Sequence, residues 1–261
     1  MLNIIVPVDF SPTSFNAAHY AAKLYKDNTK VTLTLYHFYS RGEDTVTARN
    51  FLTSLRDEFN GMANTVQIEL ESGDNFIDSL AAFAHVRGAF MIVMGLTGKT
   101  GLAQRFSGSN TLRMAEKEVC PVLIVPEDAV FEGISNALIA SDLKTAEDTP
   151  TLLAVKRVLQ LFNKPSLHIL NVNSETYIAL TPDIKAERDK MEILLAEFAP
   201  EFYFMRFYDF HESIDMFAKD RNIDLIIVAP RYHSFYERLF KTQHTTKLIY
   251  QSKVPVLAVH E

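Results

Sequence analysis

The sequence predicts an α/β fold made of two doubly wound, flavodoxin-like domains, each with a five-stranded parallel sheet. Uninterrupted apolar segments of strand length alternate with helical segments along the whole chain, which is typical of parallel sheets covered on both faces. The order of these segments occurs twice. The 261 residues also favour two domains, at about 100–200 residues per domain.

The repeat has a spacing of 134 residues. Residues 121–125 read PVLIV and residues 255–259 read PVLAV. A spacing of 133 residues places Asp9, at the end of the first expected strand, on Asp142 at the same place in the second half. Such regular spacing between distant positions indicates an internal repeat. We therefore expect two homologous domains, residues 1–130 and 134–261, joined near residue 130.

The first half contains the clearest signals for individual elements. Residues 2–8 are mostly apolar, and Ser11-Pro12 after them is typical of a helix start, with serine as the cap and proline in the first turn. Apolar residues on one stripe predict a helix over residues 74–86. The expected strands are 2–8, 31–39, 65–70, 90–94 and 122–125, and the expected helices are 12–25, 47–62, 74–86 and 109–118. The second half repeats this order, with strands near 136–141, 166–172, 202–208, 224–229 and 255–259.

Composition excludes several classes of protein. The net charge of -6 leaves no basic excess for non-specific nucleic-acid binding. One cysteine allows neither a disulfide framework nor a four-cysteine zinc site, and it fits a reducing cytosol. No segment approaches the roughly 18–20 apolar residues of a membrane helix, and the amino terminus lacks the basic region of a signal peptide. We expect a cytoplasmic protein that binds neither nucleic acid nor membranes.

The fold itself predicts where a ligand binds. Doubly wound sheets bind ligands at the carboxyl ends of the strands, where the winding direction reverses. If the strand order is 3-2-1-4-5, the first and fourth strands flank that crevice. Asp9 ends the first strand and Gly95 ends the fourth, so both should face it.

The loop after the fourth expected strand has the composition of an anion site. Glycines at 95, 98 and 108 allow close backbone approach or a positive φ. A helix start near Ser109 favours anions through its free N–H groups and its dipole. Residues 95–114 contain Lys99, Arg105 and Arg113 and no acidic residue. The alternative is a flexible loop whose glycines only close turns.

Gly98-Lys99-Thr100 does not satisfy the P-loop pattern of nucleotide triphosphatases. That motif needs a glycine at position 93, which is valine here. A helix should also start at the Lys-Thr pair, but Gly101 follows.

The spacing Gly95-x2-Gly98-x9-Gly108-Ser109 resembles the nucleotide loop of the universal stress protein family. Residues 6–11 (VPVDFS) are similar to that family's opening strand, residues 35–38 (LYHF) to its second strand and residues 121–125 to its closing strand. The resemblance covers the whole chain as two tandem copies.

This resemblance implies that ATP lies across the first and fourth strands of the first domain, bound with or without Mg²⁺. Asp9 would meet the adenosine end, Pro7 and Val8 would line the pocket, and Phe38 would lie beside the base, where the family more often has valine. The groups that would hold ribose and phosphates are backbone N–H and hydroxyl groups of Gly95, Gly98, Gly108, Ser109 and Thr111. Asn110 replaces a small apolar residue of the family and Phe90 an aspartate. A cap or turn residue is the alternative interpretation of Asp9.

The second half lacks the glycines. The spacing of 134 places Ala229, Tyr232, Thr242 and Gln243 where the first half has Gly95, Gly98, Gly108 and Ser109. Side chains there would prevent close backbone approach, so we expect a degenerate copy without ATP. His233 and His244, with Tyr232 and Tyr236, could line another pocket or a metal site; surface or packed side chains are the alternative. Cys120 precedes an apolar strand and is expected in the core.

The expected function is that of a cytosolic stress-response protein that binds ATP or a related adenine nucleotide in its first domain and has a regulatory role. A slow ATPase or nucleotide hydrolase is the alternative among enzymes, but no general base for water is evident, and no Ser-His-Asp order is present. A scaffold that binds no nucleotide is the third alternative. No catalytic residue is named.

The closing strands suggest how the edges of the sheets are protected. An exposed apolar edge strand invites pairing, and the family commonly pairs these edges between two subunits. We expect residues 122–125 to pair antiparallel with residues 256–259, as an intramolecular pseudo-dimer. A homodimer of whole chains is left open.

Overall fold

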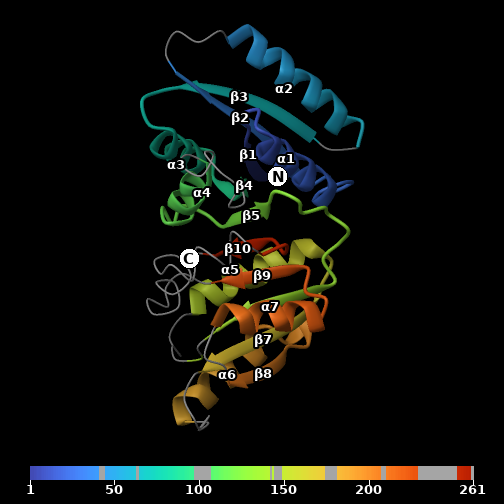
Figure 1. Cartoon of the computed structure of the whole chain (residues 1–261), viewed down its shortest axis with the longest axis vertical. Coiled ribbons are helices and arrows are strands. Elements are labelled where there is room, and N and C mark those ends of the chain that lie inside the picture. The colour runs from blue at the N-terminus through green and yellow to red at the C-terminus, as the bar shows by residue number, and fades with distance from the viewer. Residues whose placement is uncertain are drawn as a thin grey trace. The chain divides into compact units, whose positions relative to one another are not determined.

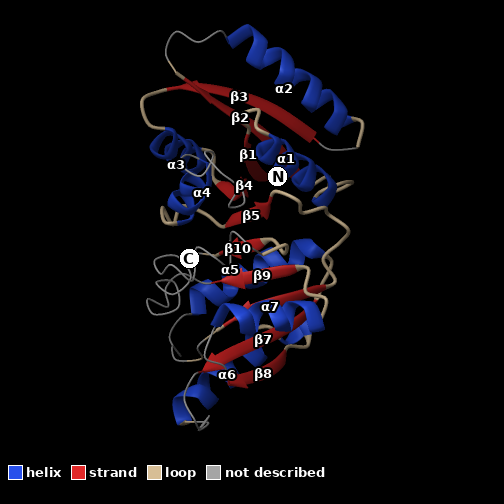
Figure 2. Cartoon of the chain, viewed as in Figure 1, coloured by secondary structure: helices blue, strands red, loops and turns tan. Residues whose placement is uncertain are grey.

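The computed structural model divides the chain into two compact units, Met1–Phe131 and Glu132–Glu261 (Figure 1). Helices and strands alternate along the first unit, and along the second unit as far as β9 (Figure 2). The structure describes residues 1–40, 45–62, 65–96, 107–141, 143, 149–173, 181–206, 210–228 and 252–259.

The first unit is a parallel, doubly wound α/β sheet. Its elements are β1 (Leu2–Pro7), α1 (Pro12–Leu24), β2 (Val31–Tyr39), α2 (Thr45–Asn60), β3 (Thr65–Ser72), α3 (Phe76–Val86), β4 (Ala89–Leu96), α4 (Ser107–Ala115) and β5 (Val122–Pro126). The strand order is β3-β2-β1-β4-β5, and the pairs are parallel. The predicted fold class is confirmed. Winding reverses between β1 and β4, so these two strands flank the crevice.

The sheet of the first unit is buried at its centre. Ile4, Ile5 and Val6 of β1 are 0% exposed, as are Ile92 and Val93 of β4. Helices α1, α3 and α4 all contact β4. Burial of both faces explains why these strands read as uninterrupted apolar runs rather than as alternating patterns.

Helix α1 begins as its sequence predicts. Ser11 is extended, and its hydroxyl accepts a hydrogen bond from the N–H of Ser14 at 3.2 Å, while Pro12 takes the first helical position. Later in the helix, the side-chain amide of Asn16 donates to the carbonyls of Pro126 and Ala129 at 3.1 and 3.0 Å. These bonds fasten the end of β5 to α1.

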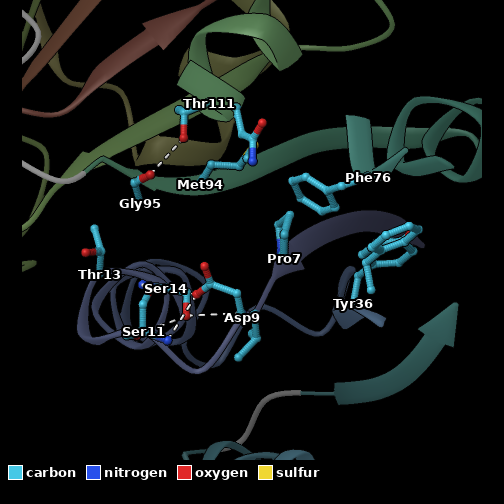
Figure 3. A pocket seen from close by; sticks show the side chains of 13 residues that line it. Pro7, Asp9, Ser11, Thr13, Ser14, Tyr36, Phe76, Met94, Gly95 and Thr111 are labelled. Atoms are coloured by element: carbon cyan, nitrogen blue, oxygen red, sulfur yellow. Dashed lines mark hydrogen bonds between the residues drawn. The ribbon is translucent and has the colours of Figure 1, made fainter. Parts of the chain in front are cut away.

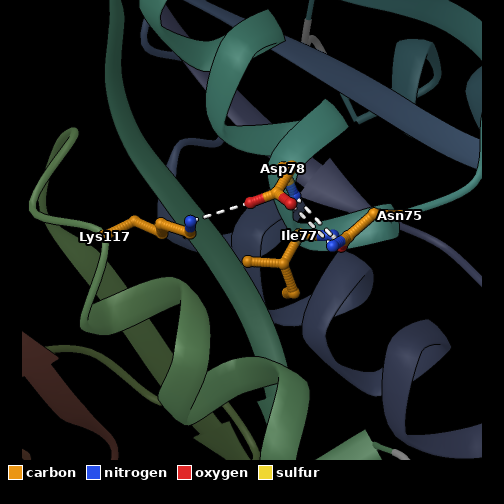
Figure 4. A network of polar contacts seen from close by, with 4 residues as sticks. All are labelled: Asn75, Ile77, Asp78 and Lys117. Carbon is orange, nitrogen blue, oxygen red and sulfur yellow. Dashed lines mark hydrogen bonds and ion pairs between the residues drawn. The ribbon is translucent and has the colours of Figure 1, made fainter.

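Helix α3 is anchored at its first turn. The Asn75 side chain accepts from the N–H groups of Ile77 and Asp78, and it donates to the Asp78 carboxylate (Figure 4). Lys117, just after α4, donates to the other Asp78 oxygen at 2.7 Å. This hydrogen bond and the charge of Lys117 hold the pKa of Asp78 below its ordinary value. The cap therefore also joins α3 to the segment after α4.

The second unit repeats the fold. Its elements are β6 (Asn136–Ala140), α5 (Thr149–Leu159), β7 (Ser166–Asn173), α6 (Pro182–Leu194), β8 (Glu201–Arg206), α7 (Phe210–Asp220), β9 (Leu225–Val228) and β10 (Val256–Ala258), with short 3-10 helices at Gln160–Phe162 and Ala196–Phe198. The order β8-β7-β6-β9-β10 mirrors that of the first unit, again with parallel pairs.

The repeat extends to individual hydrogen bonds at the ends of β1 and β6. In the first unit, the His37 ring lies 2.7 Å from the carbonyl oxygen of Val8, to which its Nδ1–H donates. In the second unit, the Asn171 side chain donates to the Ser141 carbonyl at 3.0 Å. A different residue thus makes the same connection between neighbouring strands.

Asp224 occupies the place that Phe90 has in the first unit. Its carboxylate accepts the N–H groups of Ser135 and Asn136 at 2.8 and 2.9 Å. These groups lie at the amino ends of the strands, whereas the crevice lies at the carboxyl ends. An aspartate at this position therefore supports the fold rather than a ligand.

Several predicted features lie outside the described residues. They are Gly98, Lys99, Arg105, Asp142, Ala229, Tyr232, His233, Tyr236, Thr242, Gln243 and His244. The expected pairing of the two closing strands concerns the placement of the units and stays a prediction. Cys120 is buried, as predicted, and burial raises the pKa of its thiol to about 12.

Candidate functional site: a pocket at the ends of β1 and β4

A cavity of about 180 Å³ opens at the carboxyl ends of β1 and β4 (Figure 3). It lies at the reversal of the winding, where doubly wound sheets bind ligands. The residues that line it are Pro7, Val8, Asp9, Ser11, Thr13, Ser14, Tyr36, Phe38, Phe76, Met94, Gly95, Asn110 and Thr111.

Most of the residues singled out from the sequence meet in this cavity. Those that line it are Pro7, Val8, Asp9, Phe38, Gly95, Asn110 and Thr111. Helix α4 begins at Ser107, two residues earlier than predicted, so Gly108 and Ser109 belong to its first turn. Gly98 lies outside the described residues.

Asp9 lies at the turn between β1 and α1, with its side chain partly open to solvent. Its Oδ1 accepts the backbone N–H of Ser11 at 3.0 Å and the Ser11 hydroxyl at 2.6 Å. Partial burial acts to raise the pKa of Asp9, but the hydrogen bonds from Ser11 and Ser14 outweigh it and leave the pKa below its ordinary value. Asp9 is therefore a charged turn residue that supports the helix cap and also borders the cavity.

Gly95 has a packing role that its sequence context did not reveal. A Cβ at this position would lie 2.4 Å from the carbonyl oxygen of Thr13 and 2.8 Å from the Thr13 Cγ2. The first turn of α1 thus packs directly on β4, and any side chain at Gly95 would displace backbone. The glycine is required by the protein itself, whatever the cavity holds.

Thr111 joins α4 to β4 beside the cavity. Its hydroxyl donates to the carbonyl of Gly95 at 2.8 Å, and the residue is 1% exposed (Figure 3). The resemblance implies that Thr111 helps to hold ribose or phosphates, and this role stays a prediction. The proton of its hydroxyl is directed at the strand. Asn110, one residue earlier, is half-buried at the cavity wall.

The other side of the cavity is apolar and aromatic. The rings of Phe38 and Phe76 lie 5.8 Å apart, and Phe76 opens α3. Tyr36 packs against Phe83 at 5.1 Å, and its hydroxyl donates to Glu71 at 2.9 Å. Burial and this carboxylate raise the pKa of Tyr36, so it stays neutral. Pocket walls of this kind suit a flat apolar or aromatic group.

Some lining residues escaped the sequence analysis. Tyr36 lies two residues before Phe38, so strand alternation places both on the same face, and this signal could have identified it. Thr13 and Ser14 could also have been identified, because they lie in the first turn of the helix that is predicted to begin just after Asp9. Phe76 and Met94 approach through tertiary packing, which local patterns do not encode.

No group of three or more His, Cys, Asp or Glu residues in the described part of the chain could hold a metal ion. Among the helices that the structure describes, none is both long and apolar enough to cross a membrane.

The fold and the cavity define a tandem, doubly wound α/β protein whose first unit has a pocket where such sheets bind ligands. The profile of the universal stress protein family matches residues 1–126 and 145–260. The chain belongs to the universal stress protein family, as two copies in tandem.

Solved structures show the same fold. A universal stress protein of Archaeoglobus fulgidus superposes with a TM-score of 0.74 at 16% identity, covering 99% of this chain and 96% of that one. A Pseudomonas aeruginosa protein described as functionally unknown superposes with a TM-score of 0.64 at 14% identity, covering 99% of this chain and 92% of that one. The cytoplasmic domain of a prokaryotic cation chloride cotransporter superposes with a TM-score of 0.58 at 12% identity, covering 100% of this chain and 95% of that one. No match was found among curated proteins.

Proposed function

We propose that the first unit binds an adenine nucleotide, ATP foremost, in the cavity between β1 and β4, and that the protein acts in a stress response by binding rather than by catalysis. The observation that carries this proposal is the two-sided cavity at the winding reversal. Aromatic rings form one side, and polar groups of the β1–α1 turn form the other (Figure 3).

The aromatic side is where we place the base. Phe38 and Phe76 offer ring faces and edges to a planar heterocycle, and Pro7 and Met94 add apolar area. Aromatic contacts of this kind contribute about 0.5–1.5 kcal/mol beyond their buried area.

The polar side is where we place the sugar. Asp9 stays ionised because its pKa is lowered, so it can accept hydrogen bonds from ribose hydroxyls. This role is compatible with its structural bonds, since the two bonds from Ser11 go to one carboxylate oxygen, Oδ1.

We place the phosphates at the start of α4. The first turn of a helix presents free N–H groups and the positive end of the helix dipole. Gly108 lies in that turn, and Gly95 and Thr111 connect it to β4. Phosphate binding through backbone N–H groups fits the spacing of glycines in this loop.

Binding is favoured over hydrolysis by the titratable groups of the cavity. Asp9 is the single carboxylate among the described lining residues, and no histidine lines the cavity there. The Asp9 carboxylate has a lowered pKa, which makes it a weak base, and we place it beside the sugar. A general base for water must lie near the reacting phosphate, which we place at the start of α4.

The test is a search for the natural ligand followed by titration. Purified protein is denatured, and the released small molecules are identified by mass spectrometry. ATP, ADP, AMP and cyclic AMP are then titrated calorimetrically into nucleotide-free protein. We expect an adenine nucleotide in the extract and saturable binding. Absence of binding for all four nucleotides would contradict the proposal, and conversion of ATP to ADP over hours with Mg²⁺ would favour the hydrolase instead.

A further inference from the structure

Phe10 adopts a backbone conformation that a bulky residue rarely takes. Its φ is 64°, in the left-handed region. For a residue with a Cβ this conformation costs free energy and persists only where the surroundings hold it. The two neighbours of Phe10, Asp9 and Ser11, both line the cavity.

An aromatic cluster holds the Phe10 ring. The ring lies 4.5 Å from His37 on β2, 5.7 Å from Phe51 on α2 and 6.2 Å from Phe15 on α1. His37 is itself fixed, because it is buried and donates to the carbonyl of Val8. The ring of Phe10 is thus in contact with three different elements.

The turn that this ring holds orients the polar side of the cavity. Because the chain reverses at Phe10, the Asp9 carboxylate meets both the N–H and the hydroxyl of Ser11. Ser11 in turn caps α1. A change in the φ of Phe10 would rotate Asp9 away from Ser11.

We propose that Phe10 is a positioning residue of the nucleotide pocket. Its ring, held by His37, Phe15 and Phe51, fixes the β1–α1 turn so that Asp9 is oriented before a ligand arrives. This inference rests on the proposed function, since it concerns the same pocket. Preorganisation of this kind raises affinity by removing the cost of ordering on binding.

The second unit has a residue in the same backbone conformation at the corresponding position. Leu143, at the place of Phe10, has a φ of 54°. There the Ser141 hydroxyl accepts the N–H of Leu143 at 3.1 Å. Val8 stands at the place of Ser141 and has no hydroxyl, so the first unit lacks this bond. The aromatic cluster replaces it, and leucine is shown to be compatible with the backbone conformation.

This comparison supplies the test variant. Phe10→Leu keeps a side chain that the fold accepts at this turn but removes the ring contacts. Phe10→Tyr keeps the ring and serves as the conservative rescue. Asp27→Gly is a matched control, because Asp27 is exposed after α1 with a φ of 61° and lies outside the cavity lining.

Two readouts are measured on the full chain. Calorimetric titration with ATP should show an affinity about tenfold lower for Phe10→Leu and unchanged for Phe10→Tyr and Asp27→Gly. Carboxyl carbon NMR without nucleotide should show the pKa of Asp9 rising toward its ordinary value in Phe10→Leu alone, because the bonds from Ser11 loosen.

The outcomes separate this inference from the proposed function. If the wild-type chain binds no adenine nucleotide, the proposed function fails, and the Asp9 titration still decides the positioning role. If Phe10→Leu binds ATP like wild type, or if it leaves the pKa of Asp9 unchanged, the positioning inference is overturned.

Should Phe10→Leu fail to fold, Phe51→Ala replaces it, since Phe51 is 57% exposed and its loss spares the core. This variant should change both readouts in the same direction by a smaller amount, and no change in either would overturn the inference.

Discussion

At Gly95, a cavity residue, even one added methyl group would clash with the backbone of α1. In Gly95→Ala the new Cβ would lie 2.4 Å from the Thr13 carbonyl oxygen, so α1 must move away from β4. We expect the free energy of unfolding to fall by about 1–3 kcal/mol, as for other overpacked sites. Denaturant unfolding followed by circular dichroism measures this change.

Gly88→Asn is the matched control for that experiment. Gly88 has a φ of 56°, and a Cβ there would have no neighbour within 4 Å. Asparagine is among the side chains best tolerated in the left-handed region, so the strain should cost about 1 kcal/mol or less, with no steric contribution. A Gly95→Ala variant as stable as wild type would show that α1 yields without cost.

Gly108 tests the phosphate end of the proposed site. If a phosphate packs against the backbone of the first turn of α4, a branched side chain there should block it. Gly108→Val should therefore abolish ATP binding with little change in the unfolding midpoint. Unchanged ATP affinity in a folded Gly108→Val chain, measured by calorimetry, would remove this residue from the site.

His168 should make the stability of the second unit depend on pH. It is 7% exposed, its Nδ1 has no hydrogen-bond partner within the described residues, and the rings of Tyr203 and Phe217 lie beside it. Burial lowers the pKa of His168 in the folded chain, so the unfolded chain, with an ordinary pKa of 6.5, takes up the proton first. The free energy of unfolding should be undiminished by His168 above about pH 7, and it should decline as the pH falls through 6.5.

The measurement for His168 is a pair of pH series. Unfolding free energies are compared for wild type and His168→Phe between pH 5 and 8. The decline at low pH should be smaller in the variant, because phenylalanine does not bind a proton. Parallel curves would show that His168 titrates alike in the folded and unfolded chains.

At the scale of elements, the cap of α3 connects stability to the cavity. Asn75→Ala removes the acceptor of the Ile77 and Asp78 N–H groups, and such caps are worth about 1 kcal/mol. Because Phe76 opens the same helix and lines the cavity, we also expect weaker ATP binding. Lys117→Met breaks only an exposed ion pair and should cost less. Equal effects of the two variants on thermal unfolding would contradict this ranking.

Most elements could be predicted because their signals are local. Apolar runs bounded by turns mark the strands, and Ser11-Pro12 marks the start of α1. The sequence predicts the start of α4 at Ser109, whereas the helix begins two residues earlier, at Ser107.

The cavity was predictable as a place but less so as a set of contacts. The winding reversal and the glycine spacing predict that Asp9 and Gly95 face the same crevice. The contact of Gly95 with Thr13 depends on the distance between a helix and a strand, which no local pattern specifies. The hydroxyl of Thr111 has two possible directions, and tertiary packing selects the one toward Gly95.

For the whole molecule, the asymmetry between the units predicts one nucleotide per chain. The glycines at 95, 98 and 108 have no counterparts at 229, 232 and 242. Calorimetric titration of the full chain should therefore saturate at about one ATP, and the Gly108→Val chain should show no residual binding. Two sites, or a site that survives in that variant, would mean that the second unit also binds nucleotide.

The connection between neighbouring strand ends has a consequence for how duplicated proteins diverge. The bond from Asn171 to Ser141 copies the bond from His37 to Val8 although the glycines of the loop differ between the two halves. A duplicated copy can therefore drift in its ligand loop while selection for folding keeps the frame of the crevice intact. If the second unit binds no nucleotide, as we predict, then an intact strand end alone does not identify a ligand site in a duplicated chain.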